Sequence, residues 1–397
     1  MPSRRELVRR AAVAVAVVTA VGAGTLAWSS TLLGEYSVMD MGAGGHPAHA
    51  HGPTGVAVTS LAADPDRPAD VRVELTARQE TVDVPGGRPV EGFTVNGTSP
   101  GPELRARQGD LVEVVFANES VTDGATLHWH GIDVPNAADG VAGITQDAVP
   151  VGGRHVYRFE ATDAGTYWYH SHQVSHDQVL RGLLGAIVIE PADDAAPRAD
   201  AELTALLHVY GGQHTLNGRV EDARVDVPPG ATVRVRVINT DQGTAAVWSA
   251  SPFRVVAIDG RDVHVPTDVD GQRLLIPAGG RADVALRAPS DGGVARLQVG
   301  GARSVLVGGA SASEASAPRA PQPTETLDLL AYGSPDPTAL DFDPGAPDRS
   351  YEYVIARRFG LIDGRPGNFW TVNGRMFPDV PMFHVREGEV VVMRLRN

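Results

Sequence analysis

Four of the 13 histidines form two pairs in which one residue separates the two rings, His128 with His130 and His170 with His172. Each pair lies at the end of an apolar or aromatic segment that is typical of a β-strand. Because every second side chain of a strand leaves from the same face, each pair presents two imidazoles on one side. Four imidazoles that converge on one point suit a transition metal, so the sequence predicts that these histidines bind metal.

The donor set leaves the identity of the metal open, since imidazole binds zinc, copper, iron and nickel. A catalytic zinc commonly takes three protein ligands and a water, which would leave one histidine spare, whereas a multinuclear centre would use all four. The chain has no cysteine, which excludes disulfides, thiolate ligands and cysteine nucleophiles within these residues. Ser171 is a poor candidate for a serine nucleophile, because no strained turn surrounds it.

A ten-residue pattern occurs three times and indicates a repeated fold. Each copy starts at a glycine and ends at an asparagine: GDLVEVVFAN at 109–118, GATVRVRVIN at 230–239 and GEVVVMRLRN at 388–397. Its alternation of apolar and polar residues predicts a strand with one buried face. Aligning the PVGGR and PAGGR segments that follow the first two copies places the second histidine pair opposite Leu297 and Val299. The second unit therefore has the framework without the histidines.

Length and composition favour several β domains. The chain has 397 residues, and its 45 glycines and 29 prolines imply many turns between short elements. We therefore predict an all-β fold of three β-sandwich units, two complete and a third truncated, after an N-terminal apolar helix. The predicted parts are an export signal or membrane anchor at 1–35, a flexible Met/His-containing linker at 36–66, sandwich units at 67–192 and 193–310, a linker at 311–345 and the start of a third unit at 346–397.

The N-terminus combines a basic head with an apolar run. Four arginines within residues 4–10 precede the apolar residues 11–28, which predicts a cytoplasmic N-terminus and an exported remainder. Residues 3–8 also resemble a twin-arginine export motif. We expect an uncleaved membrane anchor, because no small-residue cleavage site follows the run at the usual distance.

The linker that follows carries thioether and imidazole side chains. They belong to Met39, Met41, His46, His49 and His51. Both groups suit copper, so a copper-collecting tract is one interpretation. A plain linker is the other, and we prefer it because no scaffold fixes these residues.

The charge of the chain argues against nucleic acid as a partner. The formal net charge is −14, and arginine supplies all the basic side chains because lysine is absent. Binding to phosphate backbones requires a basic patch, which this sequence lacks.

Three segments together resemble the first domain of the three-domain multicopper oxidases, the laccase and copper-oxidase superfamily. They are LHWHG at 127–131, DGVAGITQ at 139–146 and GTYWYHSHQ at 165–173. The resemblance implies tandem cupredoxin-like Greek-key β-sandwiches. It further implies copper as the cofactor, with dioxygen and a reducing small molecule or metal ion as partners.

The resemblance also implies roles for individual residues. His128 would bind a type 2 copper, and His130, His170 and His172 would bind the type 3 copper pair. Asp139 would be the carboxylate close to this trinuclear cluster and would supply protons to reduced oxygen. The other interpretation of Asp139 is an ordinary Asp-Gly turn.

The chain departs from the family pattern in one respect. Multicopper oxidases have a type 1 copper held by two histidines and one cysteine, and further histidine-rich motifs near the C-terminus. None of these is in this sequence. We therefore expect a C-terminally incomplete chain that carries half of the cluster ligands and lacks oxidase activity. The alternatives are a membrane-tethered copper-handling protein without oxidase activity and a cupredoxin scaffold that has lost catalysis.

The remaining histidines of the predicted sandwiches stand alone in the sequence. They are His155, His176, His208, His214, His264 and His384. Isolated histidines are more often surface or hydrogen-bonded structural residues than ligands, so we predict structural roles for them. His176, close after the second pair, is the one that merits a test.

Overall fold

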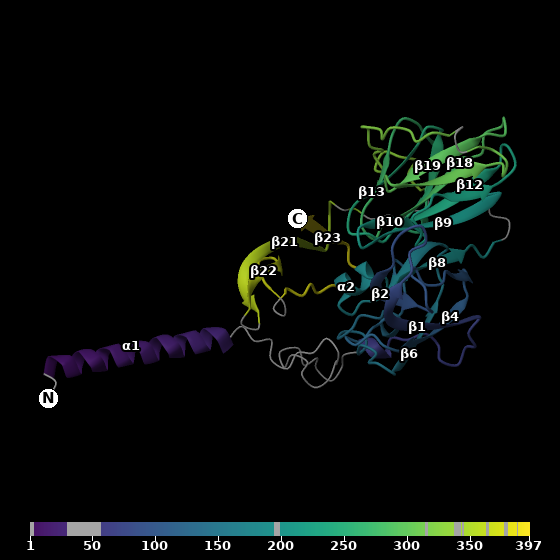
Figure 1. The fold of residues 1–397 in the computed structure, drawn as a ribbon. Coiled ribbons are helices and arrows are strands. Elements are labelled where there is room, and N and C mark those ends of the chain that lie inside the picture. The colour runs from purple at the N-terminus through teal and green to yellow at the C-terminus, as the bar shows by residue number, and fades with distance from the viewer. Residues whose placement is uncertain are drawn as a thin grey trace. The chain divides into compact units, whose positions relative to one another are not determined.

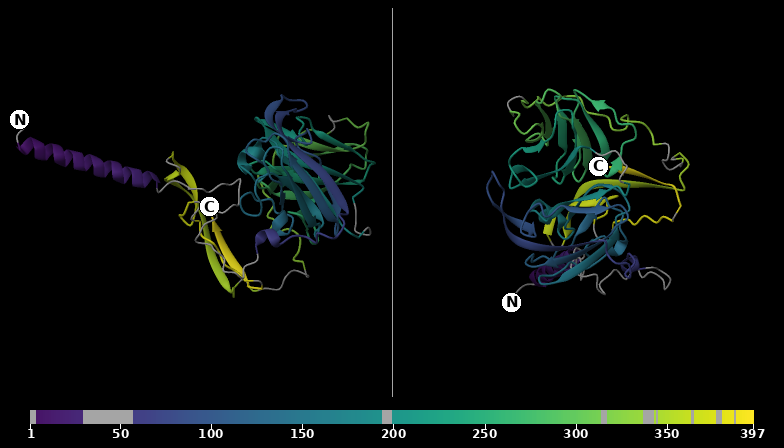
Figure 2. Two further views of the ribbon diagram at one scale, coloured as in Figure 1. Left: turned by 90° about the horizontal axis from the view of Figure 1, so that it is seen from below. Right: turned by 90° about the vertical axis from the view of Figure 1, so that its right-hand side faces the viewer.

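The computed structural model describes residues 4–29, 57–193, 199–313, 317–336, 343, 345–362, 365–376, 380–386 and 388–397 (Figure 1). The chain forms two compact units, one of residues 37–336 and one of residues 1–36 together with 337–397. The larger unit holds two β-sandwiches, which Figure 2 shows from two further sides. The Met/His segment of the predicted linker lies outside the described residues.

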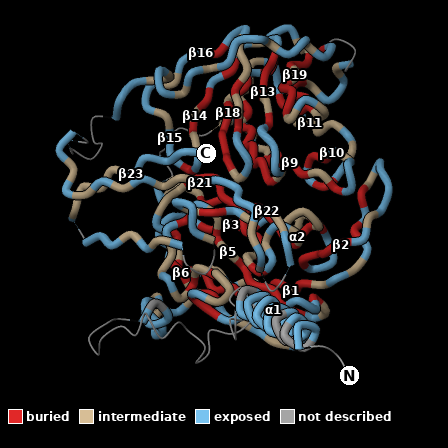
Figure 3. The backbone as a smooth tube through the Cα atoms, turned by 90° about the vertical axis from the view of Figure 1, so that its left-hand side faces the viewer, coloured by how far each residue is buried: buried red, intermediate tan, exposed pale blue. Residues whose placement is uncertain are grey.

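Two four-stranded sheets form the first sandwich, in the orders β2–β1–β4–β6 and β3–β8–β7–β5. Its strands are β1 Val71–Val82, β2 Val90–Val95, β3 Leu104–Arg107, β4 Leu111–Asn118, β5 His128–His130, β6 Arg154–Glu160, β7 Gly165–His170 and β8 Leu184–Glu190. The short 3-10 helices η2 Val58–Ser60 and η3 Asn136–Ala138 and helix α2 Ser175–Leu180 accompany them. Both sheets contribute to one core, whose buried backbone is red in Figure 3. Phe116, Trp129 and Tyr157 are fully buried in this core.

The second sandwich pairs a seven-stranded sheet with a five-stranded one. The larger sheet has the order β10–β9–β12–β18–β14–β15 with β16 on β14, and the smaller has β11–β20–β19–β13–β17. Its strands are β9 Ala201–Tyr210, β10 Gln213–Leu216, β11 Ala223–Asp226, β12 Thr232–Asn239, β13 Ala245–Ser249, β14 Phe253–Ile258, β15 Arg261–Asp262, β16 Asp268–Val269, β17 Leu274–Ile276, β18 Arg281–Arg287, β19 Val294–Val299 and β20 Arg303–Gly308. Valine and leucine dominate its core, in keeping with strands that bury one face.

The two sandwiches share one strand order, which confirms the repeat. The order β2–β1–β4–β6 recurs as β10–β9–β12–β18, and β3–β8–β7–β5 recurs as β11–β20–β19–β13. In both, the repeated ten-residue segment forms the strand that pairs in parallel with the first long strand, β4 with β1 and β12 with β9. The predicted all-β, tandem-sandwich fold is confirmed, while the domain boundaries stay predictions.

The asparagine that ends the pattern has the same task in both sandwiches. Asn118 Nδ2 donates to the carbonyl of Val149 at 2.8 Å. Asn239 Nδ2 donates to the carbonyl of Ile276 at 3.0 Å. These carbonyls lie just before the PVGGR and PAGGR turns, so each asparagine ties its strand to the turn that leads into β6 or β18.

The described residues of the smaller unit form one helix and a three-stranded sheet. Helix α1 (Arg4–Ser29) covers the predicted basic head and apolar run. Strands β21 (Arg349–Ile362), β22 (Arg365–Val372) and β23 (Val391–Arg396) have the order β22–β21–β23, with β21 and β23 parallel as β1 and β4 are. Although α1 is long, no helix among the described residues is apolar enough over its length to cross a membrane.

Candidate metal centre

The pairing of β5 with β7 brings the two histidine pairs together. His128 lies opposite His170 and His130 lies opposite Trp168. Trp129 points to the other face, where it is fully buried in the core, so both imidazoles of the first pair leave from one side. The ring centroids of His128 and His170 are 5.3 Å apart. The strand register therefore gathers residues that lie 42 positions apart in the sequence.

His172 lies just beyond the end of β7 and joins the same cluster. Its ring centroid is 5.4 Å from that of His128, and its backbone N–H donates to Thr126 Oγ1 at 3.2 Å. Ser171, between the two histidines, is fully buried and donates its hydroxyl proton to Gln178 Oε1 on α2. Ser171 thus anchors the segment and has no free hydroxyl for nucleophilic chemistry.

One ring nitrogen from each of His128, His130 and His170 lies within 4.8 Å of the other two. His130 Nδ1 and His170 Nε2 are 3.3 Å apart. Two metal–nitrogen bonds of about 2.0–2.1 Å at a tetrahedral angle place their nitrogens about 3.3 Å apart, which matches the separation of these two atoms. The donor set therefore fits a transition metal such as copper.

Backbone carbonyls orient two of the rings. His170 Nδ1 donates to the carbonyl of Ser171 at 2.9 Å, which leaves Nε2 as the nitrogen with a lone pair. His128 Nδ1 donates to the carbonyl of Asp139 at 2.9 Å, and one carboxylate oxygen of Asp139 lies 3.2 Å from the same nitrogen. The protein thus selects the tautomer that each of these rings would need to bind metal through Nε2.

Asp139 reaches His128 because the following residue is glycine. Gly140 has a φ of +74°, and a Cβ at this position would lie 1.8 Å from the carbonyl oxygen of Leu127. Any larger residue would push the turn away from β5. The two interpretations of Asp139 from the sequence, a turn residue and a carboxylate near the metal centre, are compatible. The Asp-Gly turn brings the carboxylate to the histidine cluster.

Burial and neighbouring charges set the protonation of the four rings. Burial lowers the pKa of His170 to about 3 and, with the positive charge of Arg281 adding to the effect, that of His130 to about 4. Burial also lowers the pKa of His172. Burial acts on His128 in the same direction, but its hydrogen bonds and attraction to Asp139 outweigh it and raise the pKa of His128. At pH 7 the rings of His130, His170 and His172 are therefore neutral and can donate a lone pair to metal.

The second sandwich has no histidine at the matching positions. Ser249 follows Gly230 by the same 19 residues by which His128 follows Gly109. Ser249 pairs with Leu297, as His128 pairs with His170. The structure thus matches the alignment made from the sequence.

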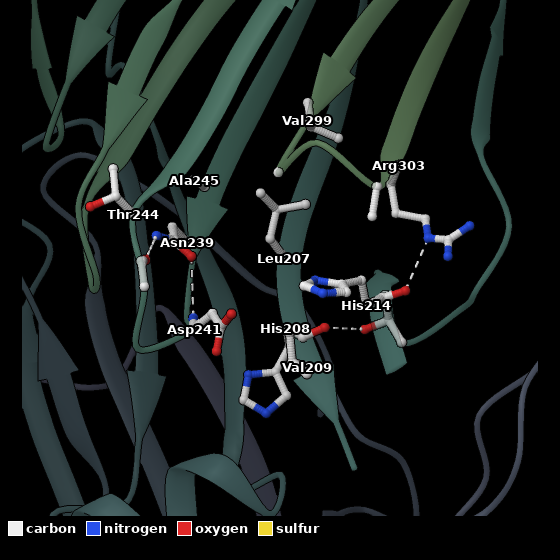
Figure 4. Close-up of a pocket in the computed structure, with 14 residues that line it drawn as sticks. Leu207, His208, Val209, His214, Asn239, Asp241, Thr244, Ala245, Val299 and Arg303 are labelled. Carbon is white, nitrogen blue, oxygen red and sulfur yellow. Dashed lines mark hydrogen bonds between the residues drawn. The ribbon is translucent and has the colours of Figure 1, made fainter. Parts of the chain in front are cut away.

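A cavity at one end of the second sandwich contains two of the isolated histidines, His208 and His214 (Figure 4). His208 is buried, but its Nδ1 lies 3.0 Å from Thr240 Oγ1 and its Nε2 lies 3.2 Å from the carbonyl of Leu180. Both ring nitrogens therefore have protein partners. His214 is exposed, and its carbonyl accepts a hydrogen bond from Arg303 Nε at 2.9 Å.

Elsewhere in the larger unit, His176 on α2 faces the side-chain amide of Gln242 at 3.0 Å. His155 packs against Tyr157, with ring centroids 4.6 Å apart. Among the described residues, the clustered ring nitrogens belong to histidines of β5 and β7, so His155 and His176 lie outside this cluster.

Comparison with known proteins identifies the relatives of this chain. The family model described as multicopper oxidase matches residues 76–194, which include both histidine pairs and Asp139. The first sandwich of this chain is thus a multicopper oxidase domain. Multicopper oxidase MmcO of Mycobacterium tuberculosis is 27% identical over 404 aligned positions, which cover 88% of this chain and 78% of that protein. Laccase-1 of Botryotinia fuckeliana is 32% identical over 244 positions, or 54% of this chain and 42% of that protein.

Solved multicopper oxidases have the same fold. The multi-copper oxidase from Pseudomonas Thermotolerans matches with a TM-score of 0.58 and 27% identity, covering 72% of this chain and 71% of that chain. Fet3p, a multicopper oxidase that functions in iron import, matches with a TM-score of 0.61 at 20% identity, covering 76% of this chain and 63% of that chain. Three of the curated relatives, among them CTB12 of Cercospora beticola, are matched over only 42%, 20% and 21% of their own length. Copper is the metal of this superfamily, and the expected resemblance is confirmed.

Sequence reasoning missed the contribution of the second sandwich to this site. Trp168 stacks on His130 with ring centroids 4.7 Å apart, and its indole N–H donates to the carbonyl of Gly279 at 3.3 Å. Gly279 lies in the PAGGR turn of the second sandwich. No local sequence pattern predicts this contact, because it depends on how the two sandwiches pack against each other.

Proposed function

We propose that this chain supplies the first-domain ligands of a trinuclear copper cluster in a laccase-like multicopper oxidase. The convergence of His130 Nδ1 and His170 Nε2 at the spacing of two ligands of one metal ion supports the proposal. His128 binds the type 2 copper, and His130, His170 and His172 bind the type 3 pair. Further ligands, beyond these four histidines, would complete the cluster.

Bound copper would supply the redox chemistry, which is the one-electron oxidation of a reducing substrate coupled to four-electron reduction of dioxygen to water. The protein positions the four rings, keeps those of His130, His170 and His172 neutral and limits access of water. Trp168 and the core residue Trp129 cover the rings and the strand that carries them.

Asp139 is the residue that we propose to move protons. Its side chain is 31% exposed and contacts His128, so it links solvent to the cluster. The hydrogen bond from His128 lowers the pKa of Asp139, so its carboxylate is ionised at pH 7 and would release to the cluster any proton that it takes from solvent.

A copper-binding protein without oxidase activity is the second candidate function, favoured by the absence of cysteine from the 397 residues. A type 1 copper requires a cysteine thiolate, so this chain alone should show no strong blue absorption band. For either function we propose an extracytoplasmic location, based on the basic head and apolar run of α1 and their resemblance to a twin-arginine signal.

Copper titration of the metal-free chain tests the proposed function. We expect Cu(II) to bind the wild-type chain and to bind the His170→Leu variant far more weakly. Oxygen consumption with a phenol, a ferrous or a cuprous donor should stay at background. Absence of copper binding would contradict both candidate functions, and laccase-like turnover by this chain would contradict the proposal that it carries half of the cluster.

A further inference from the structure

The PAGGR turn between β17 and β18 forms one wall of the histidine cluster. Gly279 has a φ of +76°, and a Cβ at this position would lie 3.0 Å from Cε1 and 3.2 Å from Nε2 of His130. His130 thus rests with one edge on the backbone of Gly279, while its Nδ1 faces His170. The position of this turn therefore determines where the His130 ring can lie.

Arg281 fastens this turn to the strand that carries His170. Its side chain is only 6% exposed. Arg281 Nε donates to the carbonyl of Thr166 on β7 at 3.2 Å, and Nη1 donates to the carbonyl of Gly279 at 3.3 Å. The same Nη1 lies 3.1 Å from Asp259 Oδ1, which partly neutralises the buried cation.

The guanidinium also fills the space beneath the residue that follows His130. Gly131 has a φ of +87°, and a Cβ there would lie 2.2 Å from Arg281 Nη2. Arg281 further stacks over Tyr167, with Cζ 5.8 Å from the ring centroid. One side chain of the second sandwich therefore contacts β7, the turn at Gly279 and the backbone next to His130.

The repeat provides an internal contrast. Arg154 is the counterpart of Arg281, since each begins the strand after its GG turn. Arg154 is exposed, whereas Arg281 is buried at the cluster. Formation of the strand therefore does not require a buried arginine here, and burial of Arg281 reflects its place between the two sandwiches.

Sandwich docking has its own polar network. Thr166 Oγ1 donates to Asp283 Oδ1 at 2.7 Å, and Arg236 Nη1 donates to Asp283 Oδ2 at 2.9 Å. This network joins β7 to the second sandwich without touching Gly279 or His130. Arg281 uses the backbone carbonyl of Thr166, so a substitution of the Thr166 side chain disrupts this network and keeps the carbonyl that Arg281 binds.

We propose that Arg281 is a positioning residue for the metal centre, holding the PAGGR turn and β7 so that His130 Nδ1 and His170 Nε2 face one ion. This inference rests on the proposed function, since it concerns the same four histidines. It assigns the second sandwich, which lacks the two histidine pairs, a part in metal binding.

Copper titration of four variants of the full chain tests this role. Arg281→Met should lower the affinity for Cu(II) by about 10–100-fold, as loss of a group that orients a ligand does, and should alter the Cu(II) electron paramagnetic resonance spectrum. Arg281→Lys keeps the positive charge but loses the planar set of guanidinium N–H donors. The Cu(II) affinity of this variant should therefore lie between those of Arg281→Met and wild type. Arg154→Met, the matched control, should bind like wild type.

Thr166→Val tests whether packing of the two sandwiches against each other, rather than the position of the histidine rings, controls copper affinity. It should lower the thermal stability of the metal-free chain and leave copper affinity within about twofold of wild type. If Arg281→Met keeps the wild-type copper affinity and spectrum, this inference is wrong while the proposed function stands. The inference is also wrong if Thr166→Val loses as much copper affinity as Arg281→Met. If Arg281→Met fails to fold by circular dichroism, Arg281→Lys decides, and wild-type affinity and spectrum in that variant would overturn the inference. A wild-type chain that binds no copper would overturn the proposed function, and this inference with it.

Discussion

The two sandwiches differ in chemistry at positions where they agree in structure. In the first, His128 faces His170 across the β5–β7 ladder, while in the second Ser249 faces Leu297 across β13–β19. Strand order and the turns held by asparagine are the same in both. The fold therefore does not require the histidines, which points to metal binding as the reason for their presence in the first sandwich.

Two buried histidines, one in each sandwich, differ in the partners of their ring nitrogens. His170 is 7% exposed and His208 is 1% exposed. His208 has protein oxygen partners at both ring nitrogens. His170 has a carbonyl at Nδ1 and, among the residues that the structure describes, the His130 nitrogen alone at Nε2. A buried histidine whose second nitrogen faces another imidazole is suited to metal, and one with two oxygen partners is suited to structure.

Exchanging residues between the sandwiches should have the largest effect in the first. His170→Leu, which places the residue of position 297 in the first sandwich, should lower copper affinity by at least about 100-fold, since it removes a ligand outright. Isothermal titration with Cu(II) measures this. His208→Gln is the control and should retain wild-type affinity, because neither nitrogen of His208 is available to metal. Equal losses in the two variants would contradict the distinction between them.

The reciprocal exchange, Leu297→His, should destabilise the protein without creating a site. Leu297 is fully buried in the apolar core, so an imidazole there would lack hydrogen-bond partners. We expect the free energy of unfolding in urea to fall by about 3 kcal/mol. Leu297→Met, similar in volume, should cost less than about 1.5 kcal/mol. A stable Leu297→His variant that binds copper at this position would contradict the prediction, because the second sandwich would then accept a metal ligand as the first does.

The metal-free chain should lose stability as the pH falls below about 6.5. The unfolded chain binds protons at its histidines below about pH 6.5, whereas burial lowers the pKa of His130 to about 4 and that of His170 to about 3 in the folded state. Between these values protonation favours the unfolded state. Urea unfolding at pH 7.5, 6.5 and 5.5 should show the decrease, and it should be smaller in His170→Leu. The same slope in both proteins would contradict the assigned protonation of His170.

The smallest expected effect concerns Asp139. Asp139→Asn keeps the backbone carbonyl that holds His128 Nδ1 but removes the carboxylate charge, so copper affinity should fall by about tenfold at most. The pKa of His128 should fall as well, which nuclear magnetic resonance of the ring proton can follow. Asp133→Asn is the control, because Asp133 is 84% exposed. A loss comparable to that of His170→Leu would mean that Asp139 itself binds the metal.

The sequence by itself determined the local framework and the candidate ligands. Alternating apolar residues define β4 and β12, and a glycine and an asparagine bound the repeated pattern, because side-chain direction and turn conformation depend on neighbours in the chain. The same period of two places His128 and His130 on one face before any tertiary contact is known. The absence of histidine at Leu297 and Val299 was also readable from the alignment alone.

Only the tertiary structure decided how these pieces meet. The register of β5 against β7 sets the 3.3 Å separation of the His130 and His170 nitrogens, and the turn at Gly140 brings Asp139 to His128. Arg281 reaches the cluster although Arg154, its counterpart, is exposed. These contacts join residues far apart in the chain, and their geometry depends on strand register and on packing of one sandwich against the other, which no local pattern encodes.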